Sequence, residues 1–365
     1  MGPSYLNDLT VKISWGLSPN NRFKFIDRMR LIKSNLLYIS SFSLLIVIIF
    51  SSIIMFFVLN RPSVEKGVNY YKVAQGQSIV KVADELNNLE VLNNAYLTRF
   101  LLKIFGFEDK VKAGIYEFNV GDSRWEVLRK LTLGEQKLLP ITIIEGSTFR
   151  QITKTIQSSA FLREDIFDKD LTSKTFSFET HGVEGLFFPD TYYYKSDTSS
   201  SEILLLALKK METVLNLEWK KRSESISSVI KTPYDALILA SIVEREAVLD
   251  AEKPIIAGVF VNRLLKNMRL QSDPTVIYAM GDDYNGNIRR SDLKINSPFN
   301  TYMQKGLPPT PIGATGLAAL RAVLNPFLSD YLYFVSKNDG SHKFSKTLKD
   351  HNKAVDYYQR KKRSE

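Results

Sequence analysis

The sequence predicts an α+β protein that combines a single N-terminal transmembrane helix, a small α+β module and a larger mixed α+β domain. Three observations lead to this fold class. Residues 36–59 form an uncharged apolar run, three later segments repeat a glycine-turn-helix pattern, and the chain beyond residue 160 alternates longer helices with loops rich in Pro, Gly and Asn. At 365 residues, 44% of them apolar and 24% charged, the chain is long enough for two or three folded units.

The run from Leu36 to Leu59 predicts a membrane anchor. Its 24 residues carry no charge and would span about 36 Å as a helix, enough to cross a bilayer with some tilt. The run starts late and lacks a small-residue cleavage site, so we expect an uncleaved helix. Basic side chains concentrate before it, which predicts that residues 1–35 are cytoplasmic and that the chain from residue 60 lies outside the cytoplasm. These basic residues are Lys12, Arg22, Lys24, Arg28, Arg30 and Lys33.

The composition argues against several classes of function. The chain has no cysteine, which removes disulfides, iron–sulfur clusters and thiol nucleophiles. Its three histidines, His181, His342 and His351, lack metal-ligand spacing and a serine partner, so neither a zinc site nor a serine triad is expected. Much of the net charge of +10 gathers at the two chain ends without an aromatic-basic pattern, so we expect no nucleic acid partner.

Three segments after the anchor share one pattern, a turn glycine followed two residues later by Ser or Thr and then by an apolar helical stripe. The hydroxyl oxygen stands where an N-cap accepts hydrogen bonds from free amides. Short alternating runs at 69–73, 115–118 and 140–144 precede the turns and predict strands. We therefore expect a module of strand-turn-helix units within residues 60–158. The glycine and hydroxyl pairs are Gly76 with Ser78, Gly121 with Ser123, and Gly146 with Thr148.

The remaining residues, 159–365, form the expected catalytic domain. Residues 200–217 and 234–249 are its clearest helix candidates, and 330–335 predicts a strand. Loops built around prolines carry amide, hydroxyl and aromatic side chains, the mixture that binds sugar hydroxyls and acetamido groups. The candidate substrate-binding residues on these loops are Gln271, Asp273, Thr275, Asn300 and Tyr302.

Glu244 is the candidate catalytic residue. In Leu237–Ala247, a helix that is apolar on nearly every side presents this carboxyl group among small side chains that leave room for a ligand. A carboxyl group in apolar surroundings is typical of a general acid. Glu246 points about 200° away on a 3.6-residue repeat. Considered alone, Glu244 is also compatible with a structural glutamate paired to an arginine at the edge of a buried helix.

Seven segments carry family motifs in a fixed order. They are Glu184–Tyr192, Ala240–Glu246, Val259–Leu264, Leu270–Tyr278, Ser297–Tyr302, Gly306–Ile312 and Tyr331–Val335. With these motifs the chain resembles the MltG/YceG-like family of endolytic murein transglycosylases from the anchor almost to the C-terminus. The resemblance implies a LysM-like module near the membrane, a YceG-like catalytic domain in the periplasm or its equivalent, and a catalytic glutamate at Glu244. Tyr192, in the first motif, joins the substrate-binding candidates.

The chain departs from the family pattern at two places. The family usually has Tyr where Phe299 stands, and it has Asn-Pro-Gly after the Pro-Ile where this chain reads Gly313-Ala-Thr-Gly316. The first departure removes one hydroxyl from a loop, and the second changes the start of a helix. Both bear on substrate positioning and loop geometry rather than on the acid itself.

The resemblance implies a lytic reaction at the bond between N-acetylmuramic acid and N-acetylglucosamine in nascent glycan strands. One glutamate protonates the glycosidic oxygen and then, as carboxylate, takes the proton of the sugar's own 6-hydroxyl, which leaves a 1,6-anhydro end. No metal or organic cofactor is implied. The expected setting is the inner membrane, with peptidoglycan strands as substrate and cell-wall synthases as candidate protein partners.

Two other functions remain open on the sequence. The first is a catalytically inactive, membrane-tethered glycan-binding scaffold of cell-wall synthesis. The second is a hydrolytic muramidase in which Asp273 acts with water, because ordinary glycosidases use two carboxyl groups. Asp273 is the only second carboxyl group that the sequence offers for that role.

Overall fold

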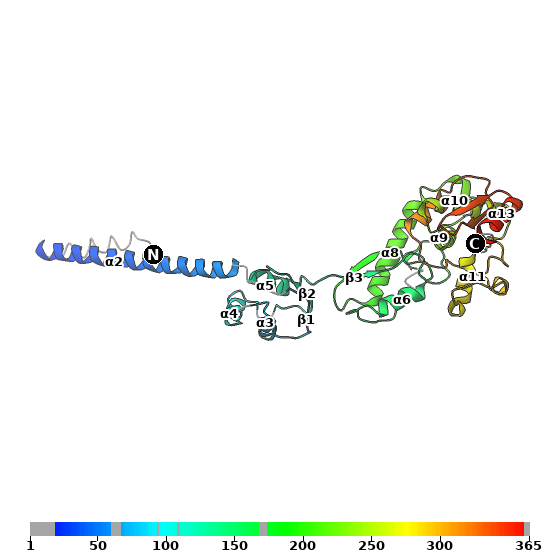
Figure 1. The fold of residues 1–365 in the computed structure, drawn as a ribbon. Coiled ribbons are helices and arrows are strands. Elements are labelled where there is room, and N and C mark those ends of the chain that lie inside the picture. Colours follow the sequence, from blue (N-terminus) through cyan, green and yellow to red (C-terminus); the bar gives the residue numbers. More distant parts are fainter. Residues whose placement is uncertain (1–18, 60–66, 93–94, 108–109, 168–173, 361–365) are drawn as a thin grey trace. The chain divides into compact units, whose positions relative to one another are not determined.

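The chain forms two compact units in the computed structural model, Met1–Lys137 and Leu138–Glu365 (Figure 1). Each unit has its own core. The start of the expected cytoplasmic segment, the residues that follow the anchor and the basic C-terminal tail lie outside the part of the chain that the structure describes. The described residues are 19–59, 67–92, 95–107, 110–167 and 174–360.

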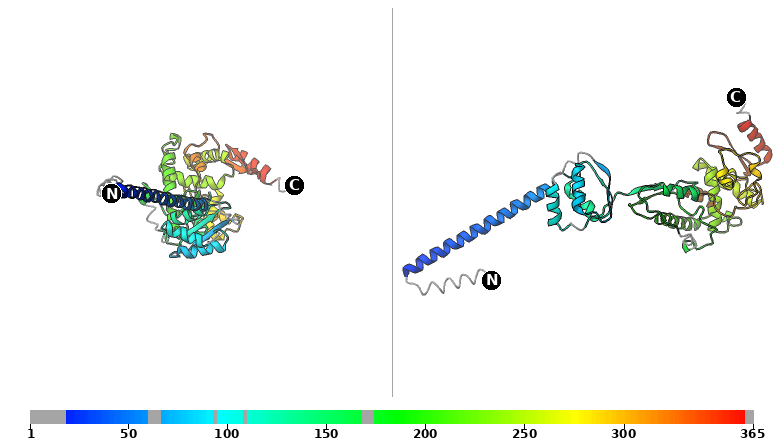
Figure 2. Two further views of the ribbon diagram at one scale, coloured as in Figure 1. Left: turned by 90° about the vertical axis from the view of Figure 1, so that its left-hand side faces the viewer. Right: turned by 90° about the horizontal axis from the view of Figure 1, so that it is seen from below.

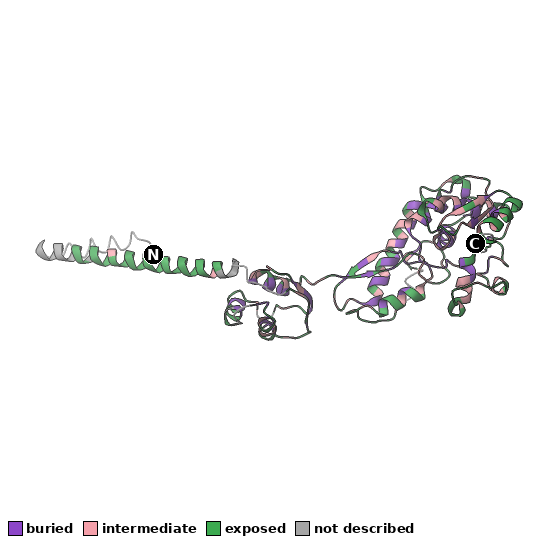
Figure 3. Cartoon of the chain, viewed as in Figure 1, coloured by how far each residue is buried: buried purple, intermediate pink, exposed green. Residues whose placement is uncertain are grey.

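The predicted anchor lies in helix α2, Pro19–Leu59, which runs as one continuous helix in two further views (Figure 2). Its stretch Arg30–Phe56 has a mean hydropathy of 2.5, and its side chains are exposed along the helix (Figure 3). Within the described residues, this is the one helix long and apolar enough to cross a membrane. The helix begins before the expected residue 36 because residues 19–35 contain no glycine, and the one proline occupies the first turn, where a missing amide costs little.

The first unit also contains a small α+β module in which two of the predicted N-caps are confirmed. Ser78 accepts a hydrogen bond from the amide of Lys81 at 3.4 Å, and Ser123 accepts one from Glu126 at 3.1 Å. Helix α4 was not predicted, because no turn glycine precedes it. The elements are β1 (Val68–Val73), α3 (Ile79–Asn88), α4 (Ala95–Ile104), β2 (Gly114–Phe118) and α5 (Arg124–Leu133), with β1 and β2 antiparallel.

The third strand-turn-helix segment, expected with this module, folds in the second unit. Strand β3 (Leu139–Thr142) pairs antiparallel with β4 (Thr191–Tyr194), so its backbone hydrogen bonds tie it to the downstream chain. Thr148 caps the following helix α6 (Phe149–Gln157) in a capping box with Gln151, as its hydroxyl pattern predicted. The second unit therefore begins about twenty residues before the boundary suggested by sequence composition.

The second unit is built around helix α9, Pro233–Glu246, whose residues Ala236–Val243 are all buried. Helices α8, α10 and α12 pack against it. The predicted strand near residue 333 is confirmed as β5, which pairs with β6. The other elements are α8 (Ser200–Trp219), α10 (Lys253–Leu265), α11 (Asp273–Met280), α12 (Leu317–Leu324), β5 (Tyr333–Ser336), β6 (His342–Ser345), α13 (Leu348–Val355), and the short helical turns η1 (Glu224–Ile226), η2 (Asp250–Glu252), η3 (Gly281–Asp283), η4 (Asp292–Lys294) and η5 (Asp356–Arg360).

An ion pair between α8 and α12 makes the stability of the second unit depend on pH. The buried Glu218 carboxylate accepts hydrogen bonds from Nε and Nη2 of Arg321, both at 3.0 Å. These bonds outweigh burial and lower the pKa of Glu218 to about 2 from its usual 4.5. Because the pKa is lowered in the folded state, the stabilisation is present above about pH 4.5 and is lost as the pH falls toward 2.

We expect Glu218→Gln to lower the free energy of unfolding at pH 7 by about 1–2 kcal/mol, a modest loss because Arg321 is half exposed. The deficit should be smaller at about pH 2, because the parent protein loses the same ion pair as the pH falls toward the lowered pKa of Glu218. Urea unfolding at the two pH values measures it. Glu224→Gln, an exposed glutamate on η1, is the matched control and should change stability by less than about 0.5 kcal/mol. A deficit independent of pH would contradict the prediction.

Candidate active site

Helix α9 carries Glu244, and its sequence explains why the helix is fixed in place. The hydroxyl of Thr232 accepts a hydrogen bond from the amide of Asp235 at 3.0 Å, and the Asp235 carboxylate accepts one from the amide of Thr232 at 2.8 Å. Pro233 occupies the first turn, where its missing amide costs nothing. Because the middle of the helix is buried on all sides, the helix presents Glu244 in its last turn at a fixed position.

Both oxygens of Glu244 are engaged. Oε1 accepts a hydrogen bond from Nζ of Lys253 at 2.6 Å, and Oε2 accepts one from the amide of Gly316 at 2.8 Å. The side chains of Glu244 and Lys253 are each only 4% exposed. This is a buried ion pair rather than the glutamate–arginine pair considered from the sequence, and its lysine lies at the first turn of α10.

Lys253 remains charged in this environment. Burial works against its ammonium group, but hydrogen bonds to Asp250, at 2.8 Å, and to Glu244 outweigh burial and raise the pKa of Lys253. An ammonium group this close stabilises the carboxylate form of its partner, because the attraction is strong where water is excluded. The ion pair therefore places a positive charge directly against the Glu244 carboxyl group.

A second carboxyl group, Glu145, reaches the same point. A β-carbon built on Gly316 would lie 1.9 Å from Oε1 of Glu145 and 3.0 Å from Oε2 of Glu244, so the two carboxyl groups meet at this glycine. Glu145 follows strand β3, and its side chain is exposed. Partial burial and the charge of Glu244 raise the pKa of Glu145.

Two loops are joined tightly to bring these carboxyl groups together. The amide of Gly146 donates to the carbonyl of Ala314 at 2.7 Å, and the amide of Ala314 donates to the carbonyl of Ser147 at 2.8 Å. A β-carbon on Gly313 would lie 2.6 Å from the carbonyl oxygen of Gly146, closer than real contacts allow. Gly313 therefore lies where the two loops touch, within the segment that departs from the family pattern.

Two of the candidate substrate-binding residues, Asp273 and Tyr302, lie close to Glu246. Glu246 accepts a hydrogen bond from the hydroxyl of Ser272 at 3.0 Å, and the hydroxyl of Tyr302 donates to Asp273 at 2.6 Å. Burial raises the pKa of Glu246 to about 7, opposed by the Ser272 hydrogen bond and helped by the charge of Asp273. Among the described residues, Glu244 accepts no hydrogen bond from this group.

Three other candidates make hydrogen bonds to neighbouring residues of the chain. Oε1 of Gln271 accepts a hydrogen bond from Nη1 of Arg263 at 3.3 Å, and Gln271 stays exposed. Thr275 is fully buried and bonds to the hydroxyl of Thr301 at 2.8 Å. Asn300 is also fully buried and donates to the carbonyls of two loop residues, Leu293 at 3.1 Å and Ile295 at 2.8 Å. Thr275 and Asn300 therefore shape the loops.

Three of the candidate residues lie on a helix or a strand. Asp273 and Thr275 were expected on a loop around a proline turn, but they lie in the first turn of α11, because Pro274 is tolerated where a helix has no amide partner to lose. Tyr192 lies on β4, only 8% exposed, and its hydroxyl donates to the carbonyl of Phe188 at 2.7 Å. Tyr192 thus belongs to the core of the second unit.

Phe299, the other departure from the family pattern, packs its ring 4.8 Å from that of Tyr278. The hydroxyl of Tyr278 donates to Glu184 at 3.1 Å, and the amide of Phe149 donates to the same carboxyl group at 2.8 Å. Burial raises the pKa of Glu184. The phenylalanine ring therefore supports a neighbouring tyrosine by packing alone.

The sequence did not identify Glu145 and Lys253, which lie next to Glu244, or Arg263, which contacts Gln271. Glu145 precedes a turn glycine after a predicted strand, which is the one signal that could have marked it. Lys253 and Arg263 look like surface charges in the sequence, yet they are 3% and 7% exposed. In the part of the chain that the structure describes, no group of three His, Asp or Glu side chains is arranged to hold a metal ion.

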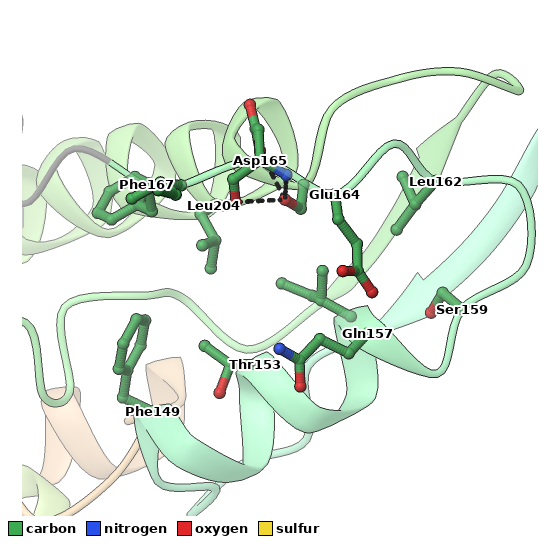
Figure 4. Close-up of a pocket in the computed structure, with 12 residues that line it drawn as sticks. Phe149, Thr153, Gln157, Ser159, Leu162, Glu164, Asp165, Phe167 and Leu204 are labelled. Carbon is green, nitrogen blue, oxygen red and sulfur yellow. Dashed lines mark hydrogen bonds between the residues drawn. The ribbon is translucent and has the colours of Figure 1, made fainter.

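A pocket of about 280 Å³ lies between α6, α8 and residues 159–167 (Figure 4). Phe149, Thr153 and Gln157 line it from α6, and Leu204 lines it from α8. The carboxylate of Asp165 is held at its wall by Ser200, at 2.6 Å. None of the candidate residues lines this pocket, so it is separate from both carboxyl groups of α9.

Comparison with known proteins gives four findings. Residues 71–357 match the YceG-like family. An endolytic murein transglycosylase of Bacillus subtilis (strain 168) is 34% identical over 309 residues, which cover 78% of this chain and 83% of the relative. One of Streptococcus pneumoniae (strain R6) is 27% identical over 319 residues, and this chain spans only 57% of its length.

The fourth finding is structural. The crystal structure of a YceG-like protein from Listeria monocytogenes matches with a TM-score of 0.50 at 29% sequence identity, over 79% of this chain and 99% of that one. The family match covers most of the chain and includes β3, α9 and the loop before α12, which together position Glu145 and Glu244. This chain therefore belongs to the YceG-like family.

Proposed function

We propose that this chain is a membrane-anchored murein transglycosylase that cuts peptidoglycan glycan strands in a lytic reaction. The observation that carries the proposal is the buried carboxyl group of Glu244, held by Lys253 and by the amide of Gly316 on segments that match the family. The names of the relatives support the reaction class, because both are endolytic murein transglycosylases.

In the proposed mechanism, Glu244 gives a proton to the glycosidic oxygen as the bond from C1 of N-acetylmuramic acid breaks. Glu244, now a carboxylate, takes the proton of the C6 hydroxyl, and O6 closes on C1 to give a 1,6-anhydro end. No water is consumed, and the carboxyl group regains its proton. The 2-acetamido group of the sugar stabilises the positive charge that develops at C1, so the protein supplies proton transfer and positioning.

The surroundings of Glu244 support its role as the base in the second step. Lys253 stabilises the carboxylate that forms when the proton leaves, and the Gly316 amide fixes its orientation. We propose that Gln271, Asp273 and Tyr302 bind sugar hydroxyls and acetamido groups, since Gln271 and Asp273 are exposed and the Tyr302 hydroxyl contacts Asp273. The buried candidates would act by shaping the loops that carry these groups.

We further propose that helix α2 crosses the membrane once, with the N-terminus in the cytoplasm, and that the module after it is LysM-like. The apolar length of α2 and the basic residues before the span support this orientation. The module would then keep the second unit close to newly made glycan outside the cytoplasm.

The assignment of the glutamate is tested by a pair of variants. Glu244→Gln keeps the shape of the side chain but can neither donate nor accept the proton, so cleavage should fall by about a hundredfold or more while folding and glycan binding persist. Glu246→Gln changes the same charge two residues away and should keep most of the activity. Release of muropeptides by the full-length protein in detergent measures both variants.

The two variants separate the alternatives. Loss of activity in Glu246→Gln with a parental rate in Glu244→Gln would move the catalytic role to Glu246, whose raised pKa suits an acid. Parental rates in both would reject the enzyme and favour the membrane-tethered glycan-binding scaffold. Glu179→Gln, a glutamate that is 86% exposed, is the control for a simple change of charge.

The mass of the released products tests the reaction type. A lytic reaction should give products that end in 1,6-anhydro-N-acetylmuramic acid, whereas a muramidase would add one water to each cleaved bond. We expect only the anhydro mass, and we expect Asp273→Asn to leave the product mass unchanged. Hydrated ends that disappear in Asp273→Asn would instead support hydrolysis with Asp273 as the second carboxyl group.

The membrane orientation has its own test. A phosphatase that folds only after export, fused after Glu365, should be active, because the proposed orientation places the C-terminal unit outside the cytoplasm. A β-galactosidase fused at the same position should be inactive. The opposite pair of results would reverse the orientation of α2.

A further inference from the structure

Two carboxyl groups meet at Gly316, although the mechanism proposed above uses one. The site of the missing β-carbon of this glycine is 1.9 Å from Oε1 of Glu145 and 3.0 Å from Oε2 of Glu244. The two loops that carry Glu145 and Gly316 are joined by a pair of backbone hydrogen bonds between residues 146–147 and Ala314. The backbone therefore holds the two loops side by side, and the side chain of Glu145 brings its carboxyl group to that of Glu244.

The two carboxyl groups differ in what they already contact. Glu244 is 4% exposed, and both of its oxygens are engaged, by the ammonium group of Lys253 and by the amide of Gly316. Glu145 is exposed, and among the described residues its carboxyl group accepts no hydrogen bond. Glu145 is thus the member of the pair that a sugar can reach directly.

The charges around the pair determine how many protons it holds. Three groups face Glu145: the carboxylate of Glu244 on α9, the ammonium of Lys253 on α10, and the carboxylate of Asp250 on η2. The two neighbouring carboxylates and partial burial oppose ionisation of Glu145, and Lys253 alone favours it. The net effect raises the pKa of Glu145. Adjacent carboxyl groups commonly share one proton, because both cannot ionise at such a distance without strong repulsion.

We propose that Glu145 is the second acid–base carboxyl group of the site and that Glu145 and Glu244 hold one proton between them. The inference rests on the proposed transglycosylase function and locates the proton that its first step needs. In the resting pair Glu145 carries the proton that the first step uses, and Glu244 keeps its hydrogen bonds to Lys253 and to the Gly316 amide. The proton passes from the pair to the glycosidic oxygen as the C1–O bond breaks, and the C6 hydroxyl returns one proton to the pair as the O6–C1 bond forms.

The proposal predicts a specific effect of Glu145→Gln on the full-length enzyme. At pH 7, kcat for glycan cleavage should fall about a hundredfold while KM changes less than about threefold, since the change removes a proton donor and not a binding surface. The alkaline limb of the pH–rate profile should move to lower pH, because the variant lacks the carboxyl group whose ionisation its neighbours oppose. A merely structural role would lower kcat without moving that limb.

Controls separate this inference from its alternatives. Glu179→Gln, at an exposed position of the same unit, should keep the parental kcat and pH profile. Glu145→Asp retains a carboxyl group and should recover at least about tenfold of the lost kcat. A parental kcat and pH profile in Glu145→Gln would overturn the inference. If Glu244→Gln and Glu246→Gln are also fully active, the proposed function fails as well, whereas an inactive Glu244→Gln beside an active Glu145→Gln rejects only the second carboxyl group.

A direct titration keeps the test valid if Glu145→Gln fails to fold. In the full-length protein labelled at the glutamate carboxyl carbon, the NMR signals that titrate with raised midpoints should include those of Glu145, Glu184 and Glu246, and Glu145→Asp should remove the Glu145 signal from the glutamate spectrum. In Glu244→Gln the same signal should titrate at lower pH, because its charged neighbour is gone. A midpoint that Glu244→Gln leaves unchanged would show that the two groups do not share a proton.

Discussion

The buried ion pair between Glu244 and Lys253 is the constraint on which the second unit depends. Removing a carboxylate and an ammonium group from water costs several kcal/mol for each ion, and the cost is offset only when both ions are paired and hydrogen-bonded. Here Lys253 also contacts Asp250, and Glu244 also accepts the Gly316 amide. One pair of charges therefore fixes where η2, α10 and the loop before α12 lie relative to α9.

Two glycines lie at this arrangement, and the closer packing of backbone against backbone is at Gly313. At Gly316 a β-carbon would overlap the Glu145 carboxyl group, and at Gly313 it would collide with a carbonyl oxygen of the facing loop. The segment Gly313-Ala-Thr-Gly316 is where the chain departs from the family pattern, and its Ala314 makes both backbone hydrogen bonds to the facing loop. The close approach at Gly313 and these two hydrogen bonds hold the two loops together.

Two glutamates only two positions apart on α9 occupy different electrostatic environments. Glu244 faces a lysine, and Glu246 faces the hydroxyl of Ser272 with the carboxylate of Asp273 nearby. The first environment stabilises a charge, and the second raises the pKa of Glu246 to about 7. Environment rather than residue type separates acids from bases in such sites, so either position could suit proton transfer on chemical grounds. The family motif and the engaged oxygens of Glu244 favour the first.

The sequence alone determined the features that depend on neighbouring residues. The apolar anchor, the N-caps at Ser78, Ser123 and Thr148, and a buried helix carrying Glu244 follow from local periodicity and hydrogen-bonding chemistry, which a linear chain records directly. Only the tertiary structure showed that β3 pairs with β4 and that Lys253 and Glu145 converge on Glu244. These contacts join residues far apart in the chain, and they arise from loop packing that leaves no periodic pattern in the sequence.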